Sequence, residues 1–226
     1  MTTVPKTSKT VEKGSDPFAL APFALDPLRL GVLISGRGSN LQAIVDAIGD
    51  GRLRARVAVV ISNRAEAPGL LRAAAAGIET LVLPHRAAAS RDEYDAQLVR
   101  ALQERGVQLV CLAGFMRLLG SAFCAAFPNA IVNVHPSLLP AFPGVDAQRQ
   151  ALEAGATVSG ATVHFVTPEL DAGPIILQAA VPVFGDDTAG SLSARILEQE
   201  HRILPEAIQL VADGRCRLDG DRVVVG

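Results

Sequence analysis

The sequence contains no tryptophan, and only 4% of its 226 residues are aromatic. It contains 21 lysines and arginines and 23 acidic residues, so the formal net charge is -2. The basic residues form no dense cluster in the sequence. A nucleic-acid surface usually combines a basic patch with stacking aromatics, so we predict no nucleic-acid partner. No apolar run approaches the roughly 18 residues of a membrane-spanning helix, so we predict no membrane partner either.

Cysteine is also scarce, because Cys111, Cys124 and Cys216 are widely spaced and form no CxxC pair. Such usage is typical of a reduced, cytoplasmic protein. The four histidines lack the close spacing of zinc ligands, so we expect no metal. Residues 1–27 lack the apolar core of a secretory signal. We therefore expect a disordered N-terminal extension over residues 1–27, followed by one domain over residues 28–226.

Short apolar runs alternate with amphipathic stretches from residue 28 onward. Runs without polar alternation, typical of buried parallel strands, occupy residues 30–34, 57–61, 80–83, 107–113 and 130–134. Helices are predicted between them at residues 41–48, 68–76 and 94–102. The remainder predicts a helix at 147–154, strands at 160–167 and 175–183, a helix at 191–212 and a hairpin at 219–220. This order indicates an α/β fold with a doubly wound, mostly parallel twisted sheet in a single domain.

A glycine-rich loop, residues 36–40, lies between the first predicted strand and the first helix. Backbone N–H groups and the helix dipole attract an anion at such a position. The loop is not a dinucleotide fingerprint, because Leu41 occupies the third glycine position, and it is not a Walker A loop. Ser39 with Gln42 fits a helix capping box, as does Ser90 with Glu93. A tight, capped turn therefore explains the loop as well as phosphate binding does.

Two polar side chains close the last of the five parallel runs. Asn133 and His135 are two residues apart, so an extended backbone points both to the same side. Pro136 stops the strand and leaves the pair at the carboxyl edge of the sheet, where open α/β folds bind ligands. An amide and an imidazole there can stabilise an oxyanion or transfer a proton. A turn-forming Asn and a structural His would give the same pattern.

A third catalytic group must come from elsewhere, and Asp171 is the best candidate. It lies in the loop of residues 169–174 between two apolar strands. A carboxylate there can orient an imidazole, hold a water molecule or accept a proton. Asp before Ala-Gly-Pro is also ordinary turn chemistry, and the residues alone favour that interpretation.

Three strings together resemble the phosphoribosylglycinamide formyltransferases: residues 36–40 (GRGSN), 133–140 (NVHPSLLP) and 170–174 (LDAGP). The resemblance runs from about residue 30 to residue 214. It implies a Rossmann-like formyltransferase fold and formyl transfer from 10-formyltetrahydrofolate, as co-substrate, to the amine of glycinamide ribonucleotide. The products would be formylglycinamide ribonucleotide and tetrahydrofolate, within de novo purine biosynthesis.

The resemblance also implies roles for single residues, with Asn133, His135 and Asp171 as the catalytic set. The ribonucleotide is expected to contact Gly38, Ser39, Asn40, Leu197, Glu198, Gln199 and Glu200. The folate is expected to contact Arg91, Met116, Arg117, Leu118, Leu119, Asn133, Thr167, Pro168, Glu169, Leu170 and Asp171. Arg37, Asp146 and Leu197 depart from residues common in the family, which leaves some secondary contacts open.

Three alternatives remain beside this function. Formyltetrahydrofolate deformylase has a similar core with water as acceptor, but it usually carries an additional N-terminal domain, for which about 27 residues are too few. Methionyl-tRNA formyltransferase needs a C-terminal RNA-binding domain that we do not expect here. A non-catalytic nucleotide-binding module would keep the scaffold, although Asn133, His135 and Asp171 speak against it. We expect a monomer or homodimer with the two small-molecule substrates as partners.

Overall fold

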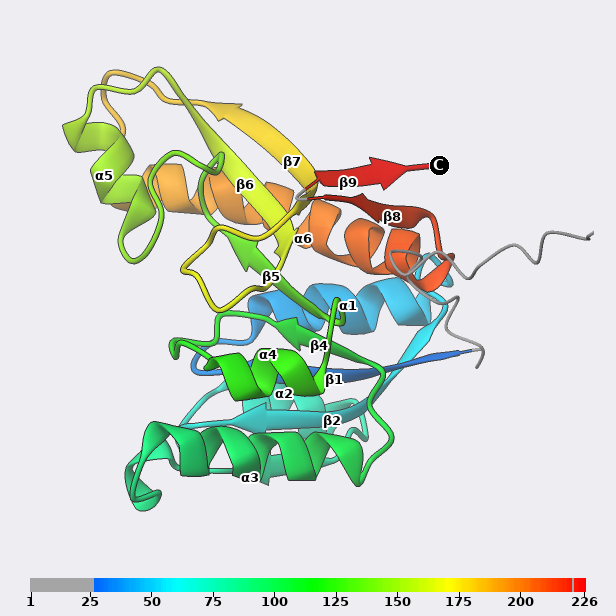
Figure 1. The fold of residues 1–226 in the computed structure, drawn as a ribbon. Helices are drawn as coiled ribbons and strands as arrows, with labels where there is room; N and C mark the ends of the chain where they lie inside the picture. The colour runs from blue at the N-terminus through cyan, green and yellow to red at the C-terminus, as the bar shows by residue number, and fades with distance from the viewer. Residues whose placement is uncertain (1–26, 221) are drawn as a thin grey trace, which may run out of the picture.

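The computed structural model describes residues 27–220 and 222–226, and it contains a seven-stranded sheet with helices on both faces (Figure 1). The strands are β1 (Leu28–Ile34), β2 (Ala55–Ser62), β3 (Thr80–Val82), β4 (Leu109–Leu112), β5 (Ile131–His135), β6 (Val158–Phe165) and β7 (Ile175–Pro182). Their order is β3-β2-β1-β4-β5-β6-β7. The first five strands pair in parallel, whereas β6 runs antiparallel to both β5 and β7. The predicted doubly wound, mostly parallel, single-domain fold is confirmed.

The helices divide between the two faces of the sheet. They are α1 (Ser39–Gly49), α2 (Gly69–Ala75), α3 (Arg91–Gln103), α4 (Ser121–Ala126), α5 (Ala147–Glu153), α6 (Ala189–Ala212) and the short 3-10 helix η1 (His85–Ala87). Because successive strand residues point to opposite faces, Val32 belongs to the same core cluster as Ile44 of α1 and Ile196 of α6, whereas Leu33 belongs to the cluster that contains Leu98 of α3. None of the helices among the described residues is long and apolar enough to cross a membrane.

The C-terminal residues form the expected hairpin, in which β8 (Cys216–Asp219) pairs antiparallel with β9 (Arg222–Val225). Gly220 lies in the turn with a φ of 60°. The predicted N-terminal extension falls outside the described residues, apart from Pro27. It stays a prediction.

The start of α1 differs from the capping box predicted for it. Gly38 is the N-cap residue, with a left-handed φ of 73°, and no side chain caps the helix. Ser39 is already the first helical residue, so the predicted Ser39 cap is wrong. A Cβ at position 38 would lie 2.5 Å from Cα of Gly69, so glycine is required both by its conformation and by the close approach of α2. The first-turn N–H groups of α1 are therefore left without a side-chain acceptor.

The predicted cap of α3 is present with a small change of register. The Ser90 hydroxyl accepts a hydrogen bond from the N–H of Glu93 at 3.1 Å. The Glu93 carboxylate accepts from the N–H of Ala89, at 2.7 Å, instead of from Ser90. The two side chains still satisfy two backbone donors at the helix start.

The strand order fixes where a ligand site belongs. The chain continues from β1 toward β2 and β3 on one side, and then returns to place β4 and β5 on the other. The carboxyl ends of β1 and β4 therefore border the crevice at which open α/β folds bind ligands. Two hydrogen bonds join the loops at this point: Ser35 N–H to the Gly114 carbonyl at 3.1 Å, and Met116 N–H to Ser35 Oγ at 2.9 Å.

Candidate active site

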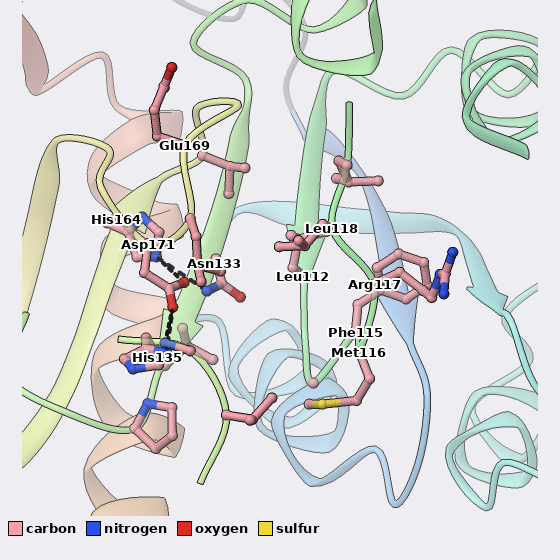
Figure 2. Close-up of a pocket in the computed structure, with 18 of the residues that line it drawn as sticks. Leu112, Phe115, Met116, Arg117, Leu118, Asn133, His135, His164, Glu169 and Asp171 are labelled. Atoms are coloured by element: carbon pink, nitrogen blue, oxygen red, sulfur yellow. Dashed lines mark hydrogen bonds and ion pairs between the residues drawn. The ribbon is translucent and has the colours of Figure 1, made fainter. Parts of the chain in front are cut away.

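Asn133, His135 and Asp171 meet in the carboxyl-terminal half of β5 (Figure 2). Asn133 and His135 point from β5 toward the same side, as their two-residue spacing predicts. Asp171 reaches them from the loop between β6 and β7, with its Oδ2 atom 3.4 Å from Nδ1 of His135. The structure thus brings the three predicted catalytic side chains together.

Oxygen atoms face both ring nitrogens of His135. Nε2 donates to the carbonyl of Phe142 at 2.9 Å, and Nδ1 faces Asp171. The two ionisable side chains are only 6% and 10% exposed, so little solvent screens their interaction. An imidazolium would have an acceptor on each side, and Asp171 would be its counter-ion.

Asp171 is held in place by its backbone and by a second donor. Its φ of 49° is left-handed, a conformation that Asp and Asn tolerate better than most residues. Its Oδ2 atom accepts a hydrogen bond from the N–H of Gly144 at 2.8 Å. The interpretation of Asp171 as a turn residue is therefore correct for the backbone, and its carboxylate still faces His135.

His164 is a site residue that the sequence prediction did not include. It lies on β6 directly opposite Asn133, and its Nδ1 donates to the carbonyl of Phe165 at 2.8 Å. Its Nε2 lies 3.2 Å from Nδ2 of Asn133 and 3.8 Å from Oδ1 of Asp171. Burial lowers the pKa of His164, which favours the neutral ring with a lone pair on Nε2.

This arrangement orients the Asn133 amide. Because Nε2 of neutral His164 can only accept, the amide must present its NH2 group to the ring. One N–H is used there, and the other remains for a ligand. The contact between His164 and Asn133 becomes evident only from the antiparallel pairing of β5 with β6. In the sequence, His164 lies within an apolar run, which gives no sign of this contact.

A cavity of about 540 Å³ opens beside these residues. Most of the residues predicted to contact the folate line this cavity, namely Met116, Arg117, Leu118, Leu119, Asn133, Thr167, Pro168, Glu169, Leu170 and Asp171. Four of the lining side chains are both apolar and exposed, namely Met116, Leu118, Val145 and Leu170. Such a surface suits an apolar, planar ligand with a few polar contacts.

Arg91 is the one predicted folate contact that does not line the cavity. It is the first residue of α3, and its charge acts on Asp95. Burial raises the pKa of Asp95, and the charge of Arg91 opposes that effect. The sequence assigned no folate contact between residues 144 and 148, where Val145 and Asp146 line the cavity, although it left the role of Asp146 open. The segment comprises the end of a loop and the first turn of α5, and Gly144 ties it to Asp171.

The predicted ribonucleotide residues are only partly brought together. Gly38, Ser39 and Asn40 lie at the start of α1, and Nδ2 of Asn40 donates to Oε2 of Glu200 on α6 at 2.7 Å. Glu198 is exposed, and Gln199 accepts from Arg202 Nε at 3.2 Å. Leu197, Glu198 and Gln199 form no hydrogen bond with the loop in the part of the chain that the structure describes.

Within residues 27–220 and 222–226, no group of three or more His, Cys, Asp or Glu side chains is arranged to hold a metal ion.

Comparisons with known proteins agree on one family. The formyl transferase family profile matches residues 28–208. A phosphoribosylglycinamide formyltransferase of Escherichia coli is 48% identical over 199 residues, covering 85% of this chain and 94% of that protein. The crystal structure of glycinamide ribonucleotide transformylase 1 from Symbiobacterium toebii is 59% identical with a TM-score of 0.87, and the match covers 88% of this chain and 93% of that one.

Longer proteins contain a similar segment. The human trifunctional purine biosynthetic protein adenosine-3 is 49% identical over 196 residues, which is 87% of this chain. The chain spans only 19% of that protein's length.

Proposed function

The chain belongs to the formyl transferase family, and we propose that it transfers the formyl group of 10-formyltetrahydrofolate to the amine of glycinamide ribonucleotide. The products are formylglycinamide ribonucleotide and tetrahydrofolate, in de novo purine biosynthesis. The observation that carries the proposal is the meeting of Asn133, His135 and Asp171 at one end of an apolar cavity.

The reaction begins when the amine of the ribonucleotide attacks the formyl carbon. The carbonyl oxygen then becomes the oxyanion of a tetrahedral intermediate, which needs hydrogen-bond donors. The second N–H of the Asn133 amide is available, because His164 fixes the amide with its NH2 group inward. The protonated His135 is the other donor once the oxyanion replaces the Phe142 carbonyl as the acceptor of its Nε2–H, and both side chains lie on the same side of β5.

Asp171 supports the charge on His135 and helps to remove a proton from the attacking amine. Its carboxylate lies 3.4 Å from Nδ1 of His135, so a full positive charge on the ring is stabilised at that atom. The amine loses its proton as the C–N bond forms, and a carboxylate accepts it directly or through a water molecule. Collapse of the intermediate then breaks the bond to the folate nitrogen, which takes up a proton from His135. The proton that Asp171 accepted from the amine passes to the His135 ring and restores the starting ion pair.

The two substrates bind on either side of His135. The uncapped N-terminus of α1, at Gly38, Ser39 and Asn40, provides backbone donors and a positive dipole for the ribonucleotide's phosphate. Glu200 binds the sugar hydroxyls. The folate occupies the apolar cavity, with the loop of residues 167–171 on one side and residues 116–119 on the other.

The direct test is incubation of the protein with 10-formyltetrahydrofolate, with and without glycinamide ribonucleotide. Release of tetrahydrofolate that depends on the ribonucleotide is the expected result. Release that is independent of the acceptor would identify a deformylase instead. No release in either case would favour a non-catalytic binding module.

We also infer a cytoplasmic protein that is a monomer or a homodimer. Cys111, Cys124 and Cys216 are all free thiols, and Cys111 and Cys216 are buried, which suits a reducing compartment. Light scattering on the purified protein, at several concentrations, distinguishes a monomer from a homodimer.

A further inference from the structure

Residues 115–119 line one side of the apolar cavity, and we call them the cavity wall. Met116 and Leu118 are exposed, whereas Phe115 and Leu119 are buried in the core cluster that includes α3. The backbone N–H and carbonyl groups of residues 117–119 form no hydrogen bond with the described part of the chain. The position of the wall therefore depends on its buried side chains and on how its two ends are held.

One hydrogen bond to a buried side chain holds each end of the wall. At the first end, the N–H of Met116 donates to Oγ of Ser35 at 2.9 Å. At the second end, the N–H of Gly120 donates to Oδ2 of Asp95 at 2.7 Å. Asp95 lies on α3 and is only 2% exposed, so water does not compete for its carboxylate. A single side chain of α3 thus fixes the backbone where the wall ends and α4 begins.

Two arginines surround this carboxylate. Burial raises the pKa of Asp95, and the N–H of Gly120 opposes this effect. The positive charges of Arg91 and Arg117 also oppose it, whereas the negative charge of Asp92 adds to it. Figure 2 shows the guanidinium of Arg117 pointing away from the proposed catalytic side chains. Arg117 therefore contributes its backbone to the wall, while its charge acts on α3.

The contact between the wall and Asp95 leaves no room for a side chain at position 120. A Cβ there would lie 2.9 Å from Oδ2 of Asp95 and 3.9 Å from Nε of Arg91. The φ of Gly120 is -84°, which other residues adopt freely, so the backbone conformation does not require glycine. The missing side chain instead allows the N–H to reach the carboxylate.

We propose that Asp95 is a positioning residue for the folate: its carboxylate holds the N–H of Gly120 and thereby fixes the cavity wall against α3. Asp95 does not line this cavity, so it acts through the wall and not by contact with the ligand. This inference rests on the proposed function. It also gives Arg91 and Arg117 a role, because both charges favour the ionised carboxylate, which is the stronger acceptor.

Binding and kinetics together test this role. Calorimetry with tetrahydrofolate measures affinity for the folate independently of catalysis. In Asp95→Ala the Kd should rise about 10-fold or more, because a hydrogen bond to a charged group is lost and the wall is no longer fixed. The KM for 10-formyltetrahydrofolate should rise similarly, while the KM for glycinamide ribonucleotide and kcat change by less than about 3-fold. Asp95→Asn keeps an acceptor for Gly120 and should stay within about 3-fold of the wild-type Kd.

Gly120→Ala tests the same contact from the side of the wall. The new Cβ would press against Oδ2 of Asp95, so the Kd for tetrahydrofolate should rise about 3- to 10-fold. In the Asp95→Ala background the carboxylate is absent, and the same change should alter the Kd by less than about 2-fold. Such non-additivity identifies a direct coupling of the two positions. Effects of the two changes that add in full would overturn the proposal.

Glu93→Ala is the matched control. Glu93 lies on the same helix, and its carboxylate accepts a backbone hydrogen bond of the same length, 2.7 Å, from Ala89. Its loss should leave the Kd for tetrahydrofolate within about 2-fold of wild type. The proposal is overturned if folded Asp95→Ala binds tetrahydrofolate as tightly as wild type, or if Glu93→Ala weakens binding equally. If Asp95→Ala does not fold, an unchanged Kd in Gly120→Ala overturns it instead.

Failure of the proposed function gives a different result. The wild type would then show no release of tetrahydrofolate that depends on the ribonucleotide. The calorimetric comparison of Asp95→Ala with Glu93→Ala needs no acceptor, so it tests the wall separately.

Discussion

Replacing Asp171 by Asn isolates the charge of the proposed catalytic carboxylate. Asn tolerates the left-handed φ of 49° found at this position, and its Oδ1 can still accept the hydrogen bond from Gly144. The change in volume is negligible. Asp171→Asn therefore removes one negative charge beside His135 and leaves the backbone and the packing as they are.

The size of the effect follows from the geometry. Unit charges 3.4 Å apart attract by about 5 kcal/mol at an effective dielectric constant of about 20. Solvent screening is weak here, because the two side chains are 6% and 10% exposed. Part of the attraction already exists before the reaction, so we expect a loss of about 3–4 kcal/mol in the transition state. This corresponds to a fall in kcat of about 100- to 1000-fold.

Steady-state kinetics with both substrates and a thermal melt measure the outcome. The Tm of Asp171→Asn should stay within about 4 °C of the wild type, equivalent to about 1 kcal/mol for a chain of this size. Asp213→Asn is the control, because Asp213 pairs with Arg54 at the C-terminal end of α6. Retention of more than about a tenth of the wild-type kcat by Asp171→Asn would refute the reasoning, as would an equal loss in the control.

Three further changes test other parts of the site. Asn133→Ala should lower kcat by about 100- to 1000-fold, while each KM changes by less than about 3-fold; turnover above about a tenth of wild type would contradict its role. Gly38→Ala should lower the free energy of unfolding in urea by at least about 2 kcal/mol, whereas Gly51→Ala, with the same φ of 73° but no atom within 4 Å, should cost only about 1–2 kcal/mol. Equal losses of stability in the two variants would show that the contact with α2 does not add to the cost at Gly38. Burial raises the pKa of Glu200, so the unfolded chain loses this proton at a lower pH than the folded chain does. The wild type therefore loses stability as pH rises above about 4.5, whereas Glu200→Gln does not. The free energy of unfolding of Glu200→Gln should rise relative to wild type above about pH 4.5, and this gain should be absent below it. A difference in the free energy of unfolding that stays the same at every pH would disprove the explanation by the raised pKa.

Local patterns predicted the positions of Asn133 and His135, but not all of their partners. A period of two residues is enough to place both side chains on one side of β5. His164 depends on the antiparallel register that sets it opposite Asn133, and apolar runs carry no information on register. Asp171 depends on how a loop closes, and its turn chemistry is the same whether or not its carboxylate meets a histidine.

The glycine loop shows a similar limit. Its residues predicted a turn into α1 and a possible anion site, but the expected Ser39 cap does not form. The reason lies outside the local sequence, because α2 approaches the loop closely enough that Gly38 must be glycine. That tertiary contact shifts the helix start by one residue and leaves its N–H groups available.

The position of His135 between two groups of residues suggests how chemistry and acceptor choice are separated. The groups proposed to act on the formyl carbon come from β5, β6 and the loop after β6, where the sheet becomes antiparallel. The groups that are expected to select the acceptor come from α1 and α6, joined by the bond between Asn40 and Glu200. His135 interacts electrostatically with both, through Asp171 on one side and Glu200 on the other. We therefore expect changes in the contact between α1 and α6 to alter which acceptor binds while the proposed oxyanion donors remain in place.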